Sequence, residues 1–244
     1  MAKGRKNGCP TNIRDWAIYI QDKTQVNETW VRIKGLSSMT RSTDADTEDG
    51  SAVTDIWEEP YITKRSGSIS LEGKPIIVGD TGAHDPGQAM LDDYALDAGC
   101  EADATIKIVD PYGSAVLIDA VVTSTEQSAD DTEETVSWDL EQVGEAERLA
   151  YVNVTSIALQ ADNDAVSALA LTAGGTGKII TITFNPATAS NQRFRVGTSN
   201  KRIAAISNIG DDTFTIVPMS AGSATVTVTS VNGSKTASIA VTVS

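Results

Sequence analysis

Short runs of alternating apolar and polar residues recur through the first 150 positions and predict β-strands. They lie at residues 16–20, 30–34, 66–71, 105–109, 115–124 and 135–142, with a brief apolar piece at 76–78. In the run at 135–142, Val136, Trp138 and Leu140 alternate with polar residues, as in a strand with one buried face. The pattern therefore predicts six or seven strands with mostly antiparallel pairing.

A polar arm at about residues 37–60 separates the strand at 30–34 from the strand at 66–71. It is rich in Ser, Thr and Asp and too long for an ordinary hairpin turn. Loops of more than about 12–15 residues without structure of their own are usually functional or disordered. We therefore expect the arm to be mobile in the free subunit and to become ordered on a neighbour. Its candidate contact residues are Thr40, Arg41, Ser42, Thr43, Asp44, Asp46, Glu48 and Asp49.

One helix is predicted at residues 86–98. Asp85 suits the N-cap, Pro86 the first helical position and Gly99 a left-handed C-cap. The helix should pack through an apolar face and expose an acidic one. The apolar face comprises Met90, Leu91, Tyr94 and Ala95, and the exposed face comprises Asp92, Asp93 and Asp97.

The composition changes near residue 150 to Thr, Ser, Val, Ala, Gly and Ile. We interpret residues 144–151 as a linker or turn, with a domain at 1–148, the linker proper at 149–152 and a second domain at 153–244. Short strands are expected at 154–159, 178–184, 203–207, 213–217, 223–230 and 236–243. Asn232-Gly233 is a strong hairpin signal between the last two. Such closely spaced strands predict a β-sandwich.

Charge divides the chain in the same way. Residues 1–150 hold 13 Lys/Arg and 29 Asp/Glu, a net charge of −16, whereas residues 151–244 hold 6 and 4, a net charge of +2. An acidic surface repels phosphates and argues against tight binding to nucleic acid. It suits a surface that DNA slides past without adhering, although acidity for solubility alone explains the composition equally well.

The sequence offers no convincing catalytic, cofactor or metal site. His84 is the only histidine, so it is the only base available to a serine or cysteine nucleophile, and it stands in a loop before the helix. The run from Gly174 to Lys178 lacks the first glycine and the final Ser/Thr of a phosphate loop. The acidic run from Asp44 to Gly50 lacks the glycine and glutamate positions of an EF-hand calcium loop. We therefore predict a non-enzyme without cofactors.

Residues 152–244 resemble a bacterial immunoglobulin-like domain of the BIG2 type. The resemblance rests on Ile203-Ala204-Ala205-Ile206 before a glycine turn, the run from Gly222 to Val228, and the final Val241-Thr242-Val243. It implies an immunoglobulin-like sandwich, and it says little about function because the fold decorates many proteins.

The first part resembles the major tail tube proteins of long-tailed, siphovirus-type phages. The shared features, in order, are the strand at 30–35, the acidic arm at 37–52, the strand at 66–71, the helix at 85–98, the hairpin at 106–113 and the strand around Trp138. The resemblance implies a mainly β fold: an antiparallel sandwich or barrel with one helix, followed by the immunoglobulin-like sandwich.

It also implies a structural virion protein that assembles in the host cytoplasm and is located in the phage tail. Its subunits would form hexameric rings stacked into a tube, with the arm reaching a neighbouring subunit or ring and the second domain outside. The partners implied are further copies of the chain, the tape measure protein, and tail-tip and terminator proteins. Double-stranded DNA would pass transiently through an acidic lumen, and no membrane would be involved. The alternative is an adhesion module that binds host-surface glycans through the second domain.

Overall fold

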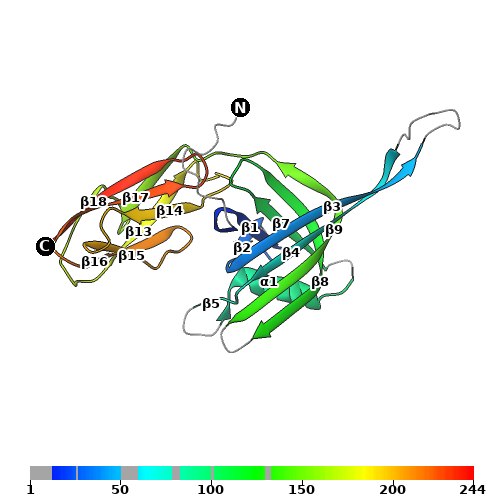
Figure 1. Ribbon diagram of the computed structural model, residues 1–244, viewed down its shortest axis with the longest axis horizontal. Helices are drawn as coiled ribbons and strands as arrows, with labels where there is room; N and C mark the ends of the chain where they lie inside the picture. The colour runs from blue at the N-terminus through cyan, green and yellow to red at the C-terminus, as the bar shows by residue number, and fades with distance from the viewer. Residues whose placement is uncertain (1–12, 26, 51–59, 79–82, 100–101, 130–132) are drawn as a thin grey trace. The chain divides into compact units, whose positions relative to one another are not determined.

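The computed structural model describes residues 13–25, 27–50, 60–78, 83–99, 102–129 and 133–244. In this part the protein is mainly β with one α-helix, as the sequence predicted. The chain divides into two compact units (Figure 1). The sheet unit comprises Ile18–Ile108 and Val116–Leu149, and the sandwich unit comprises Met1–Ala17, Val109–Ala115 and Ala150–Ser244. Two short segments thus join the sandwich unit although they are distant from it in sequence.

The sheet unit is built on a seven-stranded sheet. Its strand order is β2 (Thr29–Arg32), β1 (Ala17–Asp22), β7 (Asp103–Val109), β8 (Ala115–Ala129), β9 (Glu134–Leu149), β4 (Pro60–Gly73) and β3 (Leu36–Asp49). A small two-stranded sheet of β5 (Ile77–Val78) and β6 (Ala83–His84) precedes helix α1 (Pro86–Leu96). Strands β2 and β3 are the two edges of the large sheet.

One face of this sheet carries the core and the helix, and we call it the helix-side face. The buried side chains belong to five strands and the helix: Ile20, Ile69, Leu71, Ile106, Ile118, Trp138, Leu140 and Leu91. The Trp138 indole N–H donates a 2.8 Å hydrogen bond to the Asp92 carboxylate of α1, which ties helix and sheet together. The prediction that Asp92 is exposed is therefore wrong, because this bond draws it into a half-buried position. Among the residues that the structure describes, no helix of the sheet unit covers the opposite face, and we call it the bare face.

The predicted helix begins where expected and ends early. The Asp85 side chain accepts hydrogen bonds from the backbone N–H groups of Gly87 and Gln88, so it is the N-cap. The helix ends at Leu96 rather than residue 98, because Asp97 adopts an extended conformation. A carboxylate at a helix C-terminus opposes the helix dipole, which gives a physical reason for the early end.

The arm predicted as a loop is instead a long β-hairpin. Strands β3 and β4 are each 14 residues long and pair antiparallel from Leu36↔Gly73 to Asp49↔Pro60. The loop assignment was wrong because Ser, Thr and Asp side chains gave no apolar alternation, whereas backbone pairing needs none. Residues 51–59 lie outside the described part of the chain.

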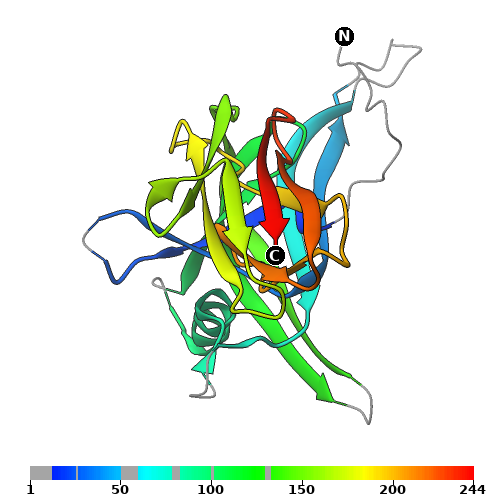
Figure 2. The same cartoon turned by 90° about the vertical axis from the view of Figure 1, so that its left-hand side faces the viewer.

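A second long hairpin is formed by β8 and β9, and the outer ends of these two strands extend beyond the body of the sheet (Figure 2). Strand β9 continues to Leu149, so residues 144–149 are strand and not linker. Gly144 adopts a φ of +74° within this strand, and this conformation suits glycine. The glycine therefore marked an irregularity in a strand and not its end.

The sandwich unit consists of two facing sheets. One has the order β11 (Asp164–Ala165), β10 (Ser156–Ala161), β13 (Lys178–Asn185), β16 (Thr213–Pro218) and β15 (Ala204–Ser207). The other has the order β12 (Ala168–Leu171), β18 (Thr236–Val243), β17 (Gly222–Ser230) and β14 (Phe194–Thr198). Residues of both sheets, among them Phe184, Phe214, Val226 and Val241, share one core. The predicted hairpin at Asn232-Gly233 is confirmed, since β17 and β18 pair antiparallel.

Buried polar groups hold the outlying segments of the sandwich unit in place. Asp15, in the short 3-10 helix η1 (Ile13–Asp15), accepts two hydrogen bonds from the Arg195 Nη2, at 2.7 and 2.5 Å. The Asn191 amide donates to the Asp15 carbonyl at 2.9 Å, and Tyr151 donates to the Asp110 carbonyl at 3.0 Å. The sandwich unit therefore depends on residues beyond the immunoglobulin-like stretch itself.

Candidate assembly surfaces

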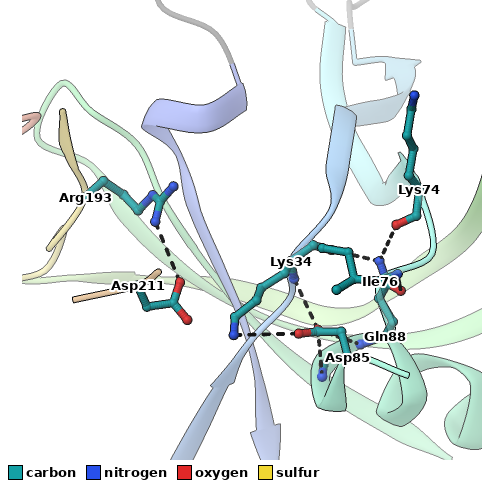
Figure 3. Close-up of polar contacts among 8 residues, drawn as sticks. Lys34, Lys74, Ile76, Asp85, Gln88, Arg193 and Asp211 are labelled. Carbon is teal, nitrogen blue, oxygen red and sulfur yellow. Dashed lines mark hydrogen bonds and ion pairs between the residues drawn. The ribbon is translucent and has the colours of Figure 1, made fainter. Parts of the chain in front are cut away.

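A buried polar junction anchors the base of the β3–β4 hairpin (Figure 3). The Asp85 side chain is fully buried and accepts hydrogen bonds from the N–H groups of Gly87, Gln88 and Lys34 at 3.1, 3.3 and 3.3 Å. The Lys34 ammonium lies 3.9 Å from the other Asp85 oxygen. The helix cap therefore also fixes the segment that leads into β3.

Gln88 extends the junction to the segment that follows β4. Its amide donates to the carbonyls of Lys34 and Lys74, both at 2.9 Å, and its oxygen accepts from the Ile76 N–H at 3.1 Å. Gly35 adopts a φ of +77°, and a Cβ there would lie 2.4 Å from the Lys74 carbonyl. The two strands are consequently held together at one end by a fixed and closely packed base.

Beyond Ser42 and Ser68, where β4 no longer pairs with β9, the hairpin becomes a two-stranded ribbon without a core. All eight predicted contact residues, from Thr40 to Asp49, lie on β3 and are exposed. The facing stretch of β4, from Pro60 to Ser66, is exposed as well. Its contacts are polar: the Ser42 and Ser68 hydroxyls are 2.7 Å apart, and the Tyr61 hydroxyl donates to Glu48 at 3.0 Å. Thr40, Arg41 and Ser42 thus lie on the edge strand of the large sheet, and the other predicted residues lie on the exposed ribbon that extends from it.

The pairing register separates the charges of β3 between the two faces. Arg41 pairs with Ile69 and Met39 with Leu71, so these two residues lie on the helix-side face. Asp44 pairs with Ser66 and Asp46 with Lys64, on the bare face. The only cation of β3 therefore lies on one face, and its first two carboxylates lie on the other.

The bare face of the sheet carries polar groups near β2 and near β4. At the end near β2, the Lys107 ammonium lies 4.0 Å from the Trp30 ring centroid and 5.0 Å from the Tyr19 centroid. Burial lowers the pKa of Lys107, and the Glu28 carboxylate acts in the opposite direction. Near β4, Asp139 accepts hydrogen bonds from Ser70 at 2.7 Å and from Ser124 at 3.0 Å. This half of the face carries carboxylates held by hydroxyl groups.

A groove of about 980 Å³ lies between α1 and the β1–β2 end of the sheet. Its apolar lining comes from the edge strand, the helix and the segment just after the helix: Val31, Pro86, Ala89, Met90 and Ala98. Asp22, Asp93 and Asp97 also line it, together with Lys23, whose ammonium donates to the Asp103 carbonyl at 2.6 Å. Burial raises the pKa of the Tyr94 hydroxyl in this groove, and Asp97 and Asp22 raise it further. The groove is therefore apolar at its walls and negative in potential.

The remaining candidates for chemistry are dispersed. His84 is exposed on β6, the glycines of the 174–178 run precede β13, and Asp44, Asp46 and Glu48 extend along a strand. Within the described residues no group of three or more His, Cys, Asp or Glu side chains could hold a metal ion. In the same part of the chain, no helix is long and apolar enough to cross a membrane.

Sequence reasoning identified the ribbon residues and missed the groove. Asp22 lies in a strand and turn about 70 residues before Asp93 and Asp97, so only the tertiary structure brings the three together. A partial signal was available, because Asp93 and Asp97 are four residues apart on one predicted helix and so share a face.

No protein-family model and no curated protein matches the sequence. Several solved structures are similar to about three fifths of the chain. One is from the virion of a native gene transfer agent particle, with 20% identity, 58% of this chain and 100% of that chain covered, and a TM-score of 0.44. Another is the SPP1 tail tube, with 14% identity, coverage of 59% and 81%, and a TM-score of 0.47. A third belongs to the baseplate of the anti-feeding prophage, with 9% identity, coverage of 59% and 98%, and a TM-score of 0.40. These similarities are remote.

Proposed function

We propose that this chain is a structural subunit of a phage tail tube. Its copies form hexameric rings that stack into a hollow tube in the virion, and DNA passes through the tube during ejection. The observation that carries the proposal is β3, a 14-residue edge strand whose outer part, residues 43–49, projects beyond the sheet as a two-stranded ribbon with residues 60–67 of β4. A two-stranded hairpin with no buried face is marginally stable alone in water. A long exposed edge strand is also a template for pairing with another chain.

The two edges of the sheet support assembly into a ring. Strand β3 ends one side of the sheet and β2 the other, so β3 of one copy can pair with β2 of the next. Such a contact joins two different surfaces, and it closes into a ring when the rotation between copies closes. A closed barrel removes both exposed edges at once. The sixfold order is taken from the resemblance to tail tube proteins.

The asymmetry of the sheet supports an inward orientation of the bare face. In a closed barrel the outer circumference is wider, so the face that carries α1 belongs outside. Glu72, Asp119, Asp139 and Glu141 then line the lumen, since each alternates with buried helix-side residues. Carboxylates there repel DNA phosphates and keep the passage free of adhesion. The sandwich unit, whose 151–244 stretch has a net charge of +2, is assigned to the outside.

Negative-stain electron microscopy of the purified full chain, with light scattering for mass, tests the proposal. We expect sixfold rings and tubes. A monomer that persists at high concentration, even with tape measure and tail-tip proteins added, would overturn it. In a second variant the ribbon is shortened by joining Asp44 to Ser66, which pair across the hairpin, through an Asn-Gly turn. This variant should remain folded and lose stacking into tubes. Tubes of normal length would show that the ribbon is not the connector.

A further inference from the structure

The groove between α1 and β2 lies at the free edge where the next subunit must arrive. Val31 of β2 pairs with the buried Ile20, so it belongs to the helix-side face, and it also lines the groove. A strand added to β2 would continue the sheet about 4.8 Å farther out. The side chains that this added strand directs to the helix-side face would then lie over the groove, because neighbouring paired strands direct their side chains to the same two faces of the sheet.

We propose that this groove receives β3 of a second copy of the chain, with Arg41 seated against Asp93, Asp97 and Asp22. The inference rests on the proposed function and names the residues by which one subunit recognises the next. Arg41 and Met39 lie on the helix-side face of β3, which is the face that meets the groove. Met39 offers an apolar side chain to Val31, Ala89 and Met90. Arg41 offers a positive charge to the three carboxylates.

Charge complementarity selects this strand. Arg41 is the only cation of β3, and the carboxylates of Asp44 and Asp46 lie on the other face, away from the acidic groove. The groove has one cation of its own, Lys23, which donates to the Asp103 carbonyl. Strand β2 has only four residues, so it can pair with about four residues of β3. Because alternate residues of a strand point to the same face, two of these four lie on the helix-side face, over the groove. These are Arg41 together with either Met39 or Thr43.

A charge exchange between the two surfaces tests the assignment. One variant carries Arg41→Glu, and the other carries both Asp93→Lys and Asp97→Lys. Both variants should fold, because all three positions are exposed. Arg202→Glu is the matched control, because it makes the same charge change as Arg41→Glu at an exposed position of the sandwich unit. The readout is the protein concentration at which half of the mass sediments as rings, measured at low and high salt.

Each charge variant alone should need at least about tenfold more protein to form rings than the wild type, and the control should match the wild type. An equimolar mixture of the two variants should form rings again. At one interface the glutamate introduced at position 41 then faces the lysines introduced at positions 93 and 97, and at the other Arg41 faces the unaltered aspartates. If the wild type forms rings and both variants do so equally well, the groove assignment is wrong while the proposed function stands. If the wild type forms no rings, the proposed function itself fails.

Discussion

Replacing Gln88 with methionine should destabilise the sheet unit strongly. Gln88 is 1% exposed, and it satisfies three backbone groups from the segments on either side of the hairpin base, those of Lys34, Lys74 and Ile76. Methionine is close in size and unbranched, so the substitution removes the hydrogen bonds without leaving a large cavity. The change thus isolates the polar contribution of the junction.

The expected loss follows from the number of partners left behind. A buried backbone donor or acceptor that loses its partner costs about 1–3 kcal/mol. Three such groups, partly relieved by local rearrangement, give a loss of about 3–5 kcal/mol. That is a large share of the roughly 5–15 kcal/mol by which a folded domain is usually stabilised. The junction should therefore be one of the most sensitive points of the unit.

Urea unfolding followed by tryptophan fluorescence measures this loss, because Trp30 and Trp138 both lie in the sheet unit. The midpoint should fall while the slope stays constant. Gln127→Met is the matched control, since the Gln127 side chain is exposed and its amide donates to the exposed Glu134 carboxylate. Its effect should stay within about 0.5 kcal/mol. A loss below about 1 kcal/mol for Gln88→Met, the lower end for a single lost partner, would refute the view that the junction holds the hairpin base.

Two further predictions concern the ribbon and the sandwich unit. Amide hydrogen exchange along β3 from Arg41 to Asp49 should be fast in the monomer and become slow in rings or tubes; equal protection in both states would exclude the ribbon from the contact. Burial raises the pKa of Tyr151 from its ordinary 10.0 to about 12, so the folded state keeps this proton to higher pH than the unfolded chain. Its stabilising contribution is complete below about pH 10 and is lost as the pH rises from about 10 to about 12. The thermal unfolding temperature should therefore fall more steeply across that range for the wild type than for Tyr151→Phe, and parallel curves would contradict the assignment.

Local chemistry made the helix start and the terminal hairpin predictable. An N-cap at Asp85 and a turn at Asn232-Gly233 depend on residues within a few positions of each other, so the sequence contains nearly all of the relevant information. The helix end was placed two residues late because the C-cap depends on the backbone that follows. Asp97 leaves the helix in an extended conformation.

Tertiary contacts account for the other differences. Asp92 looked exposed from its position on the helix, and only the Trp138 indole, 46 residues away, shows why it is half-buried. Strand β12 carries only exposed and half-buried residues and β14 has a single buried one, Phe194, so their apolar pattern was too weak to mark them. The groove could be predicted only in part, from the spacing of Asp93 and Asp97, because its walls come from a helix and a strand hairpin that meet only in the folded chain.

The ribbon shows why a surface built for assembly can escape a search for apolar alternation. Strand β3 has no buried side in the single chain. Its alternation of faces therefore shows in the positions of its charged residues and not in the positions of apolar ones. Arg41 falls on one face, and Asp44 and Asp46 fall on the other. Such separation is useful only if the two faces meet different surroundings: an acidic groove on one side and a passage for phosphates on the other. The placement of Arg41 on one face and of Asp44 and Asp46 on the other therefore agrees with the proposed ring, in which the two faces of β3 meet different surroundings.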